Sequence, residues 1–353
     1  MSNLNTRKAT FVTLGKFLSQ FSKDGITKDD TVPHNEPFFD AFKMQLERAV
    51  EFNGWFTKDS VLFAVNSWTE ALTETNIEKW LKPYDIAVDK PKTIAVIMAG
   101  NIPLVGFHDF LSVLITGHKI LIKQSSNDKH LLPILAKYIE AVNPAFKEKI
   151  TFSEGKLTDF DAVIATGSNN SAKYFDYYFG KHPHIIRQNR NGVAVLTGDE
   201  TQEELTALGE DVFRYFGLGC RNVAKLYVPE NYDFDNLFKA LYSYSHLLDN
   251  KKYTNNYDYN KAVYLMSLYD LLENGFLMLK EDASYSSPIA TLFYEKYNDL
   301  ELLKTKLALE KDQIQVVVSN GNVPNSIPFG QTQKPQLWDY ADGVDTIAFL
   351  LKQ

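Results

Sequence analysis

Short, mostly apolar runs alternate with helix-length segments along the chain from residue 93 onward. TIAVIM (93–98) and KILIK (119–123) are followed by DAVIA (161–165), VAVLT (193–197) and a further run at 223–228. Buried strands separated by helices are typical of βαβ units, in which helices cover both faces of a parallel sheet. The alternation therefore predicts an α/β protein.

The first 90 residues are expected to be helical instead. Large apolar side chains recur there at near-helical spacing, which favours a packed helical face over a cofactor-binding segment. They include Phe17, Phe21, Phe38, Phe39, Phe42, Trp55, Leu62, Trp68, Leu72 and Trp80. Because 353 residues are too many for one simple core, we expect two lobes or one large α/β unit.

Beyond residue 228 the alternation is less regular. Helices are predicted at 234–247 and 262–280, and strands at 287–294 and 314–318. The polar segment DNKKYTNNYDY (249–259) is predicted to be a loop, and it is the best candidate for an insertion or a mobile segment.

Charge and cysteine content exclude several classes of protein. With 44 acidic and 37 basic residues the formal net charge is −7, which argues against a general nucleic-acid binder. The single cysteine excludes an intramolecular disulfide and a zinc site built on several thiolates, and it fits a reducing, cytoplasmic location. No signal peptide and no run of 18 apolar residues are present, so membrane insertion is not expected.

Familiar nucleotide and metal motifs do not occur in the sequence. It lacks G-x-G-x-x-G, G-x-x-x-x-G-K-[ST], H-E-x-x-H and G-x-S-x-G. His182 and His184 lie close together without a third ligand nearby, so no metal site is expected. With Arg187 and Arg190 they form a basic cluster that could meet phosphates, although a solvated surface group is the favoured interpretation.

Cys220 is the first candidate for chemistry. It lies in FGLGCRN (216–222), between a predicted helix and a predicted strand. The two glycines let the backbone approach a substrate closely, and Arg221 beside the sulfur favours the thiolate. A buried, inert thiol is the commoner fate of a free cysteine, so the context alone leaves both interpretations open.

Three other candidates follow predicted strands, at the edge of a parallel sheet where ligands bind. Asn101 in GNIP (100–103) could aim its amide at an oxyanion, or simply cap a helix. Lys123 could meet a ribose or a phosphate, or be a solvated lysine. The turn ATGSN (165–169) suits a phosphate at a helix N-terminus, or an ordinary Ser or Asn cap.

Taken together and in order, these segments resemble the acyl-CoA reductase family, the LuxC-like fatty-acid reductases of the aldehyde dehydrogenase superfamily. The stretches that carry the resemblance are NGWFTKDSVLFAV (53–65), MAGNIPLVGFHDFLSVLITGHKILIKQSSND (98–128), ATGSNNSAKYF (165–175), RYFGLGCRNVAKLYVP (214–229) and IPFGQTQKPQLWDYADGVDTIAFL (327–350). The resemblance spans nearly the whole chain, and its motifs fall in the order that the family has.

The resemblance implies a role for each matching residue. Cys220 matches the cysteine that becomes acylated, and Asn101 the asparagine whose amide helps to form the oxyanion hole. Lys123 matches the lysine that contacts the adenosine ribose or its phosphate. The residues Thr166, Gly167 and Ser168 match the turn near the cofactor pyrophosphate, and Pro328, Phe329 and Gly330 look like a late P-F-G turn of the superfamily.

Two departures from the superfamily are informative. Hydrolytic aldehyde dehydrogenases carry a water-activating Glu upstream of the cysteine, but here no Glu occurs between Glu154 and Glu200. Transfer of the acyl group to or from a thiol such as coenzyme A fits this absence better than hydrolysis. Three residues after Lys123, many NAD-preferring relatives have a Glu, whereas this chain has Ser126. Ser126 would not repel a 2′-phosphate, so we expect NADPH, with NADH as the alternative.

The fold implied by the resemblance has two open parallel-sheet, Rossmann-like domains. We expect a helical region at 1–90, a cofactor-binding domain at 91–197, a catalytic domain at 198–333 and a return segment at 334–353 with an oligomerisation strand. The activity implied is NADPH-dependent reduction of a fatty acyl thioester such as acyl-CoA to the aldehyde. The family also implies a homo-oligomer.

Two alternatives stay open at this point. The chain could be the reductase subunit of a complex in which a partner protein supplies the acyl group. It could instead be a non-catalytic scaffold, which would predict a buried and unreactive Cys220. His108, just past Asn101, is a candidate proton carrier, although a packed or capping histidine is the favoured interpretation.

Overall fold

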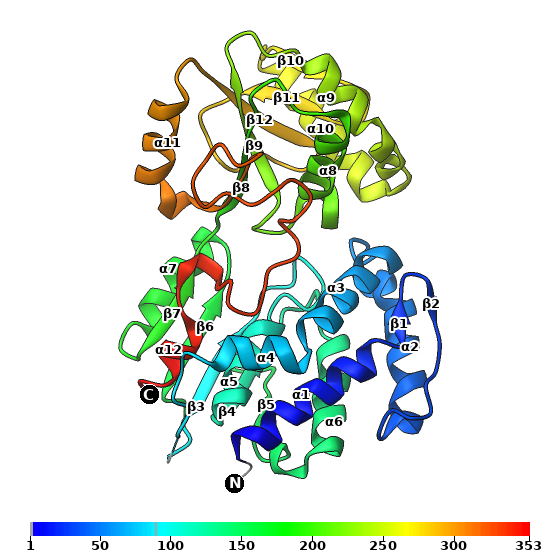
Figure 1. Ribbon diagram of the computed structural model, residues 1–353, viewed down its shortest axis with the longest axis vertical. Helices are drawn as coiled ribbons and strands as arrows, with labels where there is room; N and C mark the ends of the chain where they lie inside the picture. Colours follow the sequence, from blue (N-terminus) through cyan, green and yellow to red (C-terminus); the bar gives the residue numbers. More distant parts are fainter. Residues whose placement is uncertain (1–2, 89) are drawn as a thin grey trace. The chain divides into compact units, whose positions relative to one another are not determined.

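The computed structural model describes residues 3–88 and 90–353, and it divides the chain into two compact units. The first unit comprises Met1–Gln188 and Gln336–Gln353, and the second comprises Asn189–Pro335. Each unit is built on its own sheet (Figure 1). The predicted boundary at residue 197 differs from this division, because the strand that follows Asn189 pairs within the second sheet.

The sheet of the first unit has the order β5-β4-β3-β6-β7, and all its neighbouring strands are parallel. Its strands are β3 (Thr93–Ile97), β4 (Lys119–Lys123), β5 (Ile150–Phe152), β6 (Ala162–Thr166) and β7 (His184–Arg187). β3 is at the centre of this sheet, and Ile94, Ala95 and Val96 on it are fully buried. The predicted alternation of strands and helices is therefore confirmed for this region.

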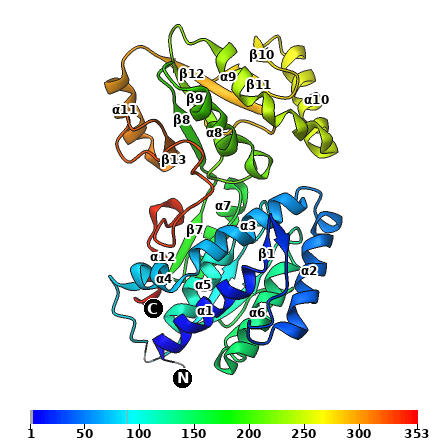
Figure 2. The same ribbon diagram turned by 45° about the vertical axis from the view of Figure 1, so that its right-hand side comes forward.

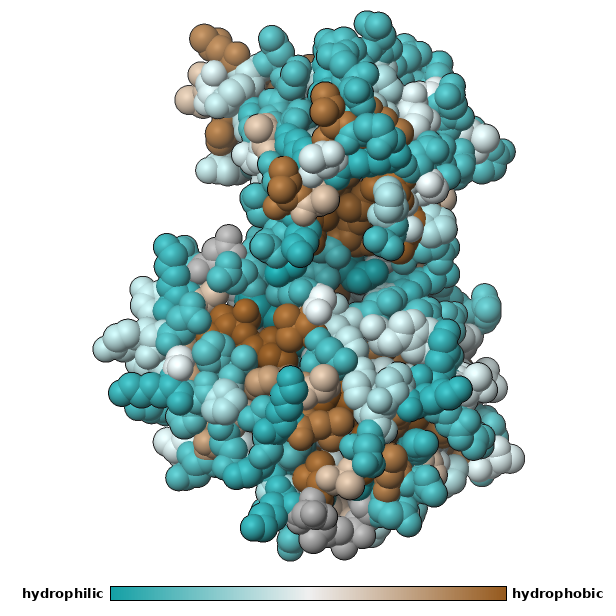
Figure 3. Space-filling view, turned by 60° about the vertical axis from the view of Figure 1, so that its left-hand side comes forward, coloured by the Kyte–Doolittle hydropathy of each residue, from teal (hydrophilic) through white to brown (hydrophobic). Residues whose placement is uncertain are grey.

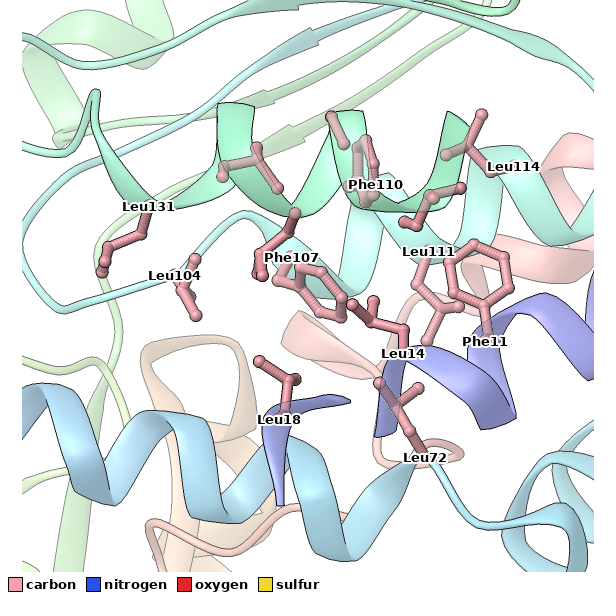
Figure 4. Packing of buried hydrophobic residues seen from close by; sticks show 14 of the residues in the cluster. Phe11, Leu14, Leu18, Leu72, Leu104, Phe107, Phe110, Leu111, Leu114 and Leu131 are labelled. Atoms are coloured by element: carbon pink, nitrogen blue, oxygen red, sulfur yellow. The ribbon is translucent and has the colours of Figure 1, made fainter. Parts of the chain in front are cut away.

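Two layers of helices cover one face of this sheet. The inner layer is α5 (Phe107–Thr116) and α6 (Leu131–Val142), and α1 (Leu4–Leu18) packs across both. Phe11 and Leu14 of α1 meet Phe107 and Leu111 of α5 in one apolar cluster (Figure 4). Burial of each such side chain contributes roughly 1.5–3 kcal/mol.

The remaining N-terminal helices complete the outer layer, to which α1 belongs (Figure 2). They are α2 (Asn35–Phe52), α3 (Lys58–Ala71) and α4 (Glu74–Leu81), with a short hairpin of β1 (Phe21–Ser22) and β2 (Gly25–Ile26) between α1 and α2. The described part of the predicted helical region, 3–88, is thus mostly helical and packs on the first sheet, while residues 1–2 and 89 lie outside the description. The helix α7 (Asn169–Phe179) follows β6, and its Phe179 packs with Val163 of β6 and Ala95 of β3.

The C-terminal return segment joins the first unit as a helix. Residues Thr346–Leu350 form α12, which packs against α5, and Ile347 and Leu350 are fully buried. The expected oligomerisation strand is therefore not what the structure has here. The apolar residues of VDTIAFLL are used inside the first unit, so they are not presented at a sheet edge.

The sheet of the second unit has the order β10-β11-β12-β9-β8-β13 and is parallel except for the edge strand β10. Its strands are β8 (Asn191–Val195), β9 (Val223–Pro229), β10 (Leu271–Glu273), β11 (Met278–Glu281), β12 (Thr291–Tyr297) and β13 (Ile314–Val318). The helix α11 (Leu300–Leu309) packs on the face that carries Tyr227. The helices α8 (Gln202–Phe213) and α9 (Phe234–Leu241) pack together on the other side (Figure 1).

Two expectations for the second unit are wrong. The polar segment 249–259 is not a loop, because Lys251–Met266 form α10. Asn250 caps this helix, and Tyr253 and Tyr257, one turn apart, supply its buried face. The predicted helix at 262–280 ends at Met266, and the rest of that range holds β10, the start of β11 and the connections before each strand.

Hydrophilic residues cover most of the surface in the view of Figure 3, with scattered patches of apolar residues. The exposed apolar residues include Tyr174, Tyr177 and Tyr178 on α7, Met266 and Leu268 at the end of α10, and Leu302 and Leu309 on α11. Among the described residues, no helix has the length and the apolar content that crossing a membrane requires.

Candidate active site

The candidate residues of the first unit gather at the carboxyl edge of its sheet. Asn101 follows β3, Lys123 ends β4, and Thr166 ends β6. The chain runs from β3 outward to β4 and β5, and then returns to place β6 on the other side of β3. The order of the strands reverses between β3 and β6, and ligands of open α/β sheets bind at such a switch point.

The loop that carries Asn101 is held from three sides. Gly100 lies so close to Ser125 that an added Cβ would come within 2.6 Å of the serine side chain. An added Cβ on Gly106 would come within 2.5 Å of Met98. Between them, Leu104 has a left-handed backbone with φ 57°, and its N–H donates to Oδ2 of Asp128 at 2.8 Å. Asn101 itself is partly buried.

Asp128 is a residue that the sequence analysis missed. Its side chain lies beside a small, mostly apolar cavity lined by Met98, Leu104, Phe107 and Leu132, among others. Burial raises the pKa of Asp128 to about 6, partly offset by the hydrogen bond from Leu104. The only sequence signal was an acidic residue five positions after Lys123, and it does not reveal that contact.

We expect the raised pKa of Asp128 to be visible in folding stability. The native state holds this proton more tightly than the unfolded chain, so the contribution of Asp128 to stability is lost as pH rises from about 4 to 6. Asp128→Asn removes the titration and keeps an oxygen for Leu104. Its unfolding free energy relative to wild type should therefore rise by about 2 kcal/mol between pH 4 and pH 7. Urea unfolding of both proteins at several pH values measures this, and a pH-independent difference would contradict it.

The predicted cofactor residues lie on two loops of the same edge. Nζ of Lys123 donates to the carbonyl of Gly155 at 3.1 Å, and Ser126 is exposed. Ser168 caps α7 by accepting from the N–H of Ser171. A Cβ on Gly167 would come within 2.9 Å of Phe175, so only glycine lets the turn lie this close to the helix. The result is a helix N-terminus with small residues before it, which fits a pyrophosphate.

The predicted basic cluster is not a single group. Arg187, at the end of β7, is buried, and its Nη2 donates to Oδ1 of Asp109 at 2.8 Å while its Nη1 pairs with Oδ2. It also reaches Thr346 of α12 at 3.3 Å. His182 lies against Phe160 instead, and His184 is exposed. Arg187 therefore links β7, α5 and α12 as a buried ion pair, which was not anticipated.

His108 is packed rather than placed as a proton carrier. Its Nε2 donates to the carbonyl of Leu337 at 2.9 Å, and its ring lies 5.5 Å from that of Trp80 and 5.7 Å from that of Tyr340. Burial lowers the pKa of His108, which keeps the imidazole neutral. The packed interpretation from the sequence is therefore the one that the structure supports.

Cys220 is exposed, at the amino end of β9 in the second unit. Tyr215, Phe216 and Gly217, just before it, all have left-handed backbones, with φ between 55° and 76°. Two consecutive bulky residues in that region are uncommon. Their rings are nevertheless buried, and the packing turns the chain sharply between α8 and the cysteine. The cysteine is thus presented at the surface by a tightly folded segment.

Asn222 anchors this segment and was also missed by the sequence analysis. Its Oδ1 accepts from the N–H of Gly219 at 2.8 Å, and its Nδ2 donates to the carbonyls of Asp211 and Arg214, each at 2.9 Å. An added Cβ on Gly192 would meet the carbonyl of Asn222 at 2.8 Å. The side chain is almost completely buried, so both flanks of Cys220 are fixed to the end of α8 and to β8.

Asn222→Ala should therefore destabilise the second unit. It leaves the N–H of Gly219 and the carbonyls at the end of α8 without this partner, and an unsatisfied buried group costs roughly 1–3 kcal/mol. We expect the unfolding free energy to fall by at least about 2 kcal/mol, measured by urea denaturation. Asn298→Ala, at an exposed asparagine, is the matched control and should change little. Equal stability of the two variants would contradict the anchoring role.

The P-F-G turn is tied to the same region of the second unit. The N–H groups of Gly330 and Thr332 donate to the carboxylate of Asp211 at 2.6 and 2.9 Å. Nε of Arg221 donates to the carbonyl of Thr332. Burial raises the pKa of Asp211 to about 6 despite these bonds. The turn at 328–330 and the segment around Cys220 are therefore connected through α8 and Arg221.

The described residues offer no set of metal ligands. Residues 3–88 and 90–353 contain no group of three or more His, Cys, Asp or Glu side chains arranged to hold a metal ion.

One family model matches the part of the chain that carries Asn101, Lys123 and Cys220. The model of the acyl-CoA reductase (LuxC) family matches residues 77–244, which include Asn101, Lys123 and Cys220. A long-chain acyl-protein thioester reductase of Aliivibrio fischeri is 26% identical over 226 residues, covering 58% of this chain and 47% of that protein. A second one, from Photobacterium leiognathi, is 24% identical over 193 residues, with 49% and 40% covered. The matched region spans about half the length of these relatives or less.

Solved structures with the same fold are aldehyde dehydrogenases. Aldehyde dehydrogenase 21 of Physcomitrella patens superposes with a TM-score of 0.62 at 12% identity, over 91% of this chain and 74% of that one. The indole-3-acetaldehyde dehydrogenase AldA of P. syringae, solved with NAD⁺, gives 0.62 at 14% identity with the same coverage. The expected aldehyde-dehydrogenase-like fold is confirmed. The family model covers just under half of the chain, and over that region the chain is similar to the acyl-CoA reductase (LuxC) family.

Proposed function

We propose that this protein reduces a fatty acyl thioester, such as acyl-CoA, to the aldehyde through an S-acyl intermediate on Cys220. The observation that carries the proposal is the presentation of Cys220. The chain's single cysteine is exposed, and its flanks are fixed by Asn222. A cysteine that serves packing would be buried, and a scaffold protein would have no need of a rigid segment that exposes a thiol.

The cofactor we propose is NADPH, with NADH as the alternative. A helix N-terminus preceded by Thr166, Gly167 and Ser168 suits the pyrophosphate, and Lys123 suits the adenosine ribose or its phosphate. Exposed Ser126 brings no negative charge against a 2′-phosphate. The bound nicotinamide supplies the hydride that reduces the thioester. Aldehyde dehydrogenases of the same fold have been solved with NAD⁺, which supports a nicotinamide cofactor in general.

In the first half of the proposed reaction, the thiolate of Cys220 attacks the thioester carbonyl. The resemblance to the family assigns the Asn101 amide and the backbone N–H of Cys220 as the donors to the oxyanion that forms. As this intermediate collapses, the bond to coenzyme A breaks, and the coenzyme leaves as its thiolate. The acyl group is then held on Cys220 as a new thioester.

In the second half, hydride addition to this enzyme-bound thioester forms another tetrahedral oxyanion, which the same donors stabilise. Its collapse breaks the carbon–sulfur bond, releases the aldehyde and restores the thiolate of Cys220. A thioester accepts hydride more readily than a carboxylate does, because a carboxylate carries a negative charge that repels the hydride. One acyl thioester, one reduced cofactor and one proton are consumed per aldehyde formed.

Hydrolysis of the intermediate is disfavoured by the residues near the end of β7. No Glu occurs between Glu154 and Glu200. The buried carboxylate of Asp109 is paired with Arg187 through both oxygens. The acyl group on Cys220 should therefore react with hydride or with a thiol and not with water.

The experiment that tests the proposal is NADPH oxidation by the purified protein with a panel of acyl-CoAs of increasing chain length. We expect aldehyde to form in a one-to-one ratio with oxidised cofactor. NADH run in parallel decides the cofactor preference. No activity with any acyl-CoA, although NADPH binds, would contradict acyl-CoA as the donor.

A second candidate function keeps the chemistry and changes the donor. The curated relatives are named acyl-protein thioester reductases, which favours an acyl group delivered on a partner protein. Turnover that appears only when an acylated partner protein is added would support this candidate.

We also propose that the protein forms a homo-oligomer. Exposed apolar residues such as Met266 and Leu268 are available for contacts between copies, and sedimentation velocity measures the oligomeric state.

A further inference from the structure

The loop that carries Asn101 and the loop that follows Lys123 are joined by one side-chain hydrogen bond. The N–H of Leu104 donates to Oδ2 of Asp128 at 2.8 Å, across a separation of 24 residues. The first loop connects β3 to α5, and the second connects β4 to α6. The bond therefore links an oxyanion-donor candidate with a cofactor-loop candidate inside one unit.

The conformation of the first loop depends on this bond. Leu104 has a left-handed backbone, which is unfavourable for a non-glycine residue. A buried N–H in that conformation cannot join the hydrogen-bonding pattern of α5, which begins at Phe107. Asp128 gives it an acceptor, and so it stabilises the turn that brings the chain from Asn101 into the helix.

The second loop is closed independently of the Asp128 side chain. The backbone N–H of Asp128 donates to the carbonyl of Ser125 at 3.2 Å, and Nε2 of Gln124 donates to the carbonyl of Asp128 at 3.0 Å. The N–H of Asn127 donates to Oγ of Ser125. All three bonds use atoms that survive when the side chain of Asp128 is replaced. Removing its carboxylate should thus affect the Asn101 loop far more than the loop after Lys123.

Ser125 makes a second link between the two loops. Its side chain fills the space that a Cβ on Gly100 would need, directly before Asn101. The Asn101 loop therefore rests on the loop after Lys123 at one end and is hydrogen-bonded to it by Leu104 near the other.

We propose that Asp128 is a positioning residue, which holds Asn101 in place for oxyanion binding by fixing Leu104 to the loop that follows Lys123. The inference rests on the proposed function of Asn101 and Lys123. Asp128 acts through the Asn101 loop, since Oδ2 of its carboxylate accepts from the backbone N–H of Leu104. A buried carboxylate without a hydrogen-bond donor is unfavourable. The N–H of Leu104 supplies such a donor, so the same bond also holds the Asp128 side chain in place.

The kinetic test compares Asp128→Ala, Asp128→Asn and the control Lys129→Ala. Asp128→Ala removes the acceptor and should lower kcat by about 10²-fold, as expected for a misplaced catalytic group, with KM for NADPH within about twofold of wild type. Asp128→Asn keeps an acceptor oxygen and should restore most of kcat. Lys129 is exposed and next in sequence, so its replacement should leave both parameters unchanged. A normal kcat in Asp128→Ala, or a rise in KM for NADPH without a fall in kcat, would overturn the proposal.

A double-mutant cycle separates positioning from general damage. If Asp128 acts through Asn101, Asp128→Ala should lower kcat by less than about twofold when added to Asn101→Ala. An equal loss in both backgrounds would show that Asp128 does not act through Asn101.

Hydrogen exchange provides a measurement that does not depend on activity. Peptides covering 99–106 should exchange at least about tenfold faster in Asp128→Ala than in wild type, while Asp128→Asn stays close to wild type. Peptides covering 123–128 should change much less. If the wild-type protein reduced no acyl-CoA, the proposed function would fail, and the exchange result would still decide whether Asp128 fixes the loop. Unchanged exchange at 99–106 would overturn the positioning role.

Discussion

Cys220→Ala should abolish acyl-CoA reduction. The covalent route has no other thiol to use, because Cys220 is the only cysteine of the chain. Loss of the nucleophile should lower turnover by about 10³-fold or more. NADPH oxidation with acyl-CoA, followed spectroscopically, measures the loss, and intact-mass spectrometry should detect one acyl adduct on wild type when NADPH is omitted and none on the variant.

Stability is the control for this prediction. The side chain of Cys220 is exposed, so its truncation should change the unfolding free energy by no more than about 0.5 kcal/mol. NADPH binding should also be unaffected, because Lys123 and the turn at 166–168 belong to the other unit. A Cys220→Ala protein that still reduces acyl-CoA would exclude the S-acyl intermediate.

Asn101→Ala should impair both halves of the reaction, because both pass through an oxyanion. Removal of one oxyanion donor typically costs about 2.7–4 kcal/mol, which is a fall of about 10²- to 10³-fold in kcat. KM for acyl-CoA should change much less, since the donor acts mainly in the transition state. Steady-state kinetics measures the two parameters separately.

Asn101→Asp sharpens the same test. The carboxylate keeps the shape of the amide, removes its N–H donors and places a negative charge near the developing oxyanion. We expect it to be at least as impaired as the alanine variant, although its packing is better conserved. If Asn101→Asp turns over at a near-normal rate, Asn101 is not an oxyanion donor and acts as a loop residue.

The strands that were predicted correctly are those with a strong local signal. β3, β4, β6 and β9 are short runs rich in apolar residues. β3 and β6 are also buried along most of their length, and burial on both faces selects a continuous apolar sequence. The candidate residues at their carboxyl ends followed from this pattern, and the resemblance to the family assigned their roles.

The helix α10 could not be predicted in the same way. Its segment is mostly polar, and its contact with the unit depends on Tyr253 and Tyr257. The hydroxyl of Tyr253 donates to the carbonyl of Phe276, and that of Tyr257 donates to Glu273. Two tyrosines one turn apart in a polar background give too weak a periodicity to distinguish a helix from a loop.

The supporting residues of the site depend on contacts that sequence spacing does not contain. Asp128 bonds the backbone of Leu104 on another loop, and Asp211 accepts from Gly330 and Thr332 more than a hundred positions later. Asn222 bonds to residues nearby in the sequence, but its amide donates to carbonyls at the end of α8, which precedes it. The familiar pattern is an asparagine that precedes a helix and caps its N-terminus. Each of these roles follows from the backbone path and not from the residue type.

The return of the chain to the first unit sets an order for folding during synthesis. Asn189–Pro335 are translated before α12, yet α12 covers α5 of the unit that began at the N-terminus. His118, between α5 and β4, can form its hydrogen bond to the carbonyl of Leu350 only when α12 is in place. The same holds for the hydrogen bond from Arg187 to Thr346. The second unit can therefore fold without α12, whereas the first unit is incomplete until α12 is in place. A released chain truncated before residue 346 should hold a protease-resistant second unit beside a first unit that proteases can still attack.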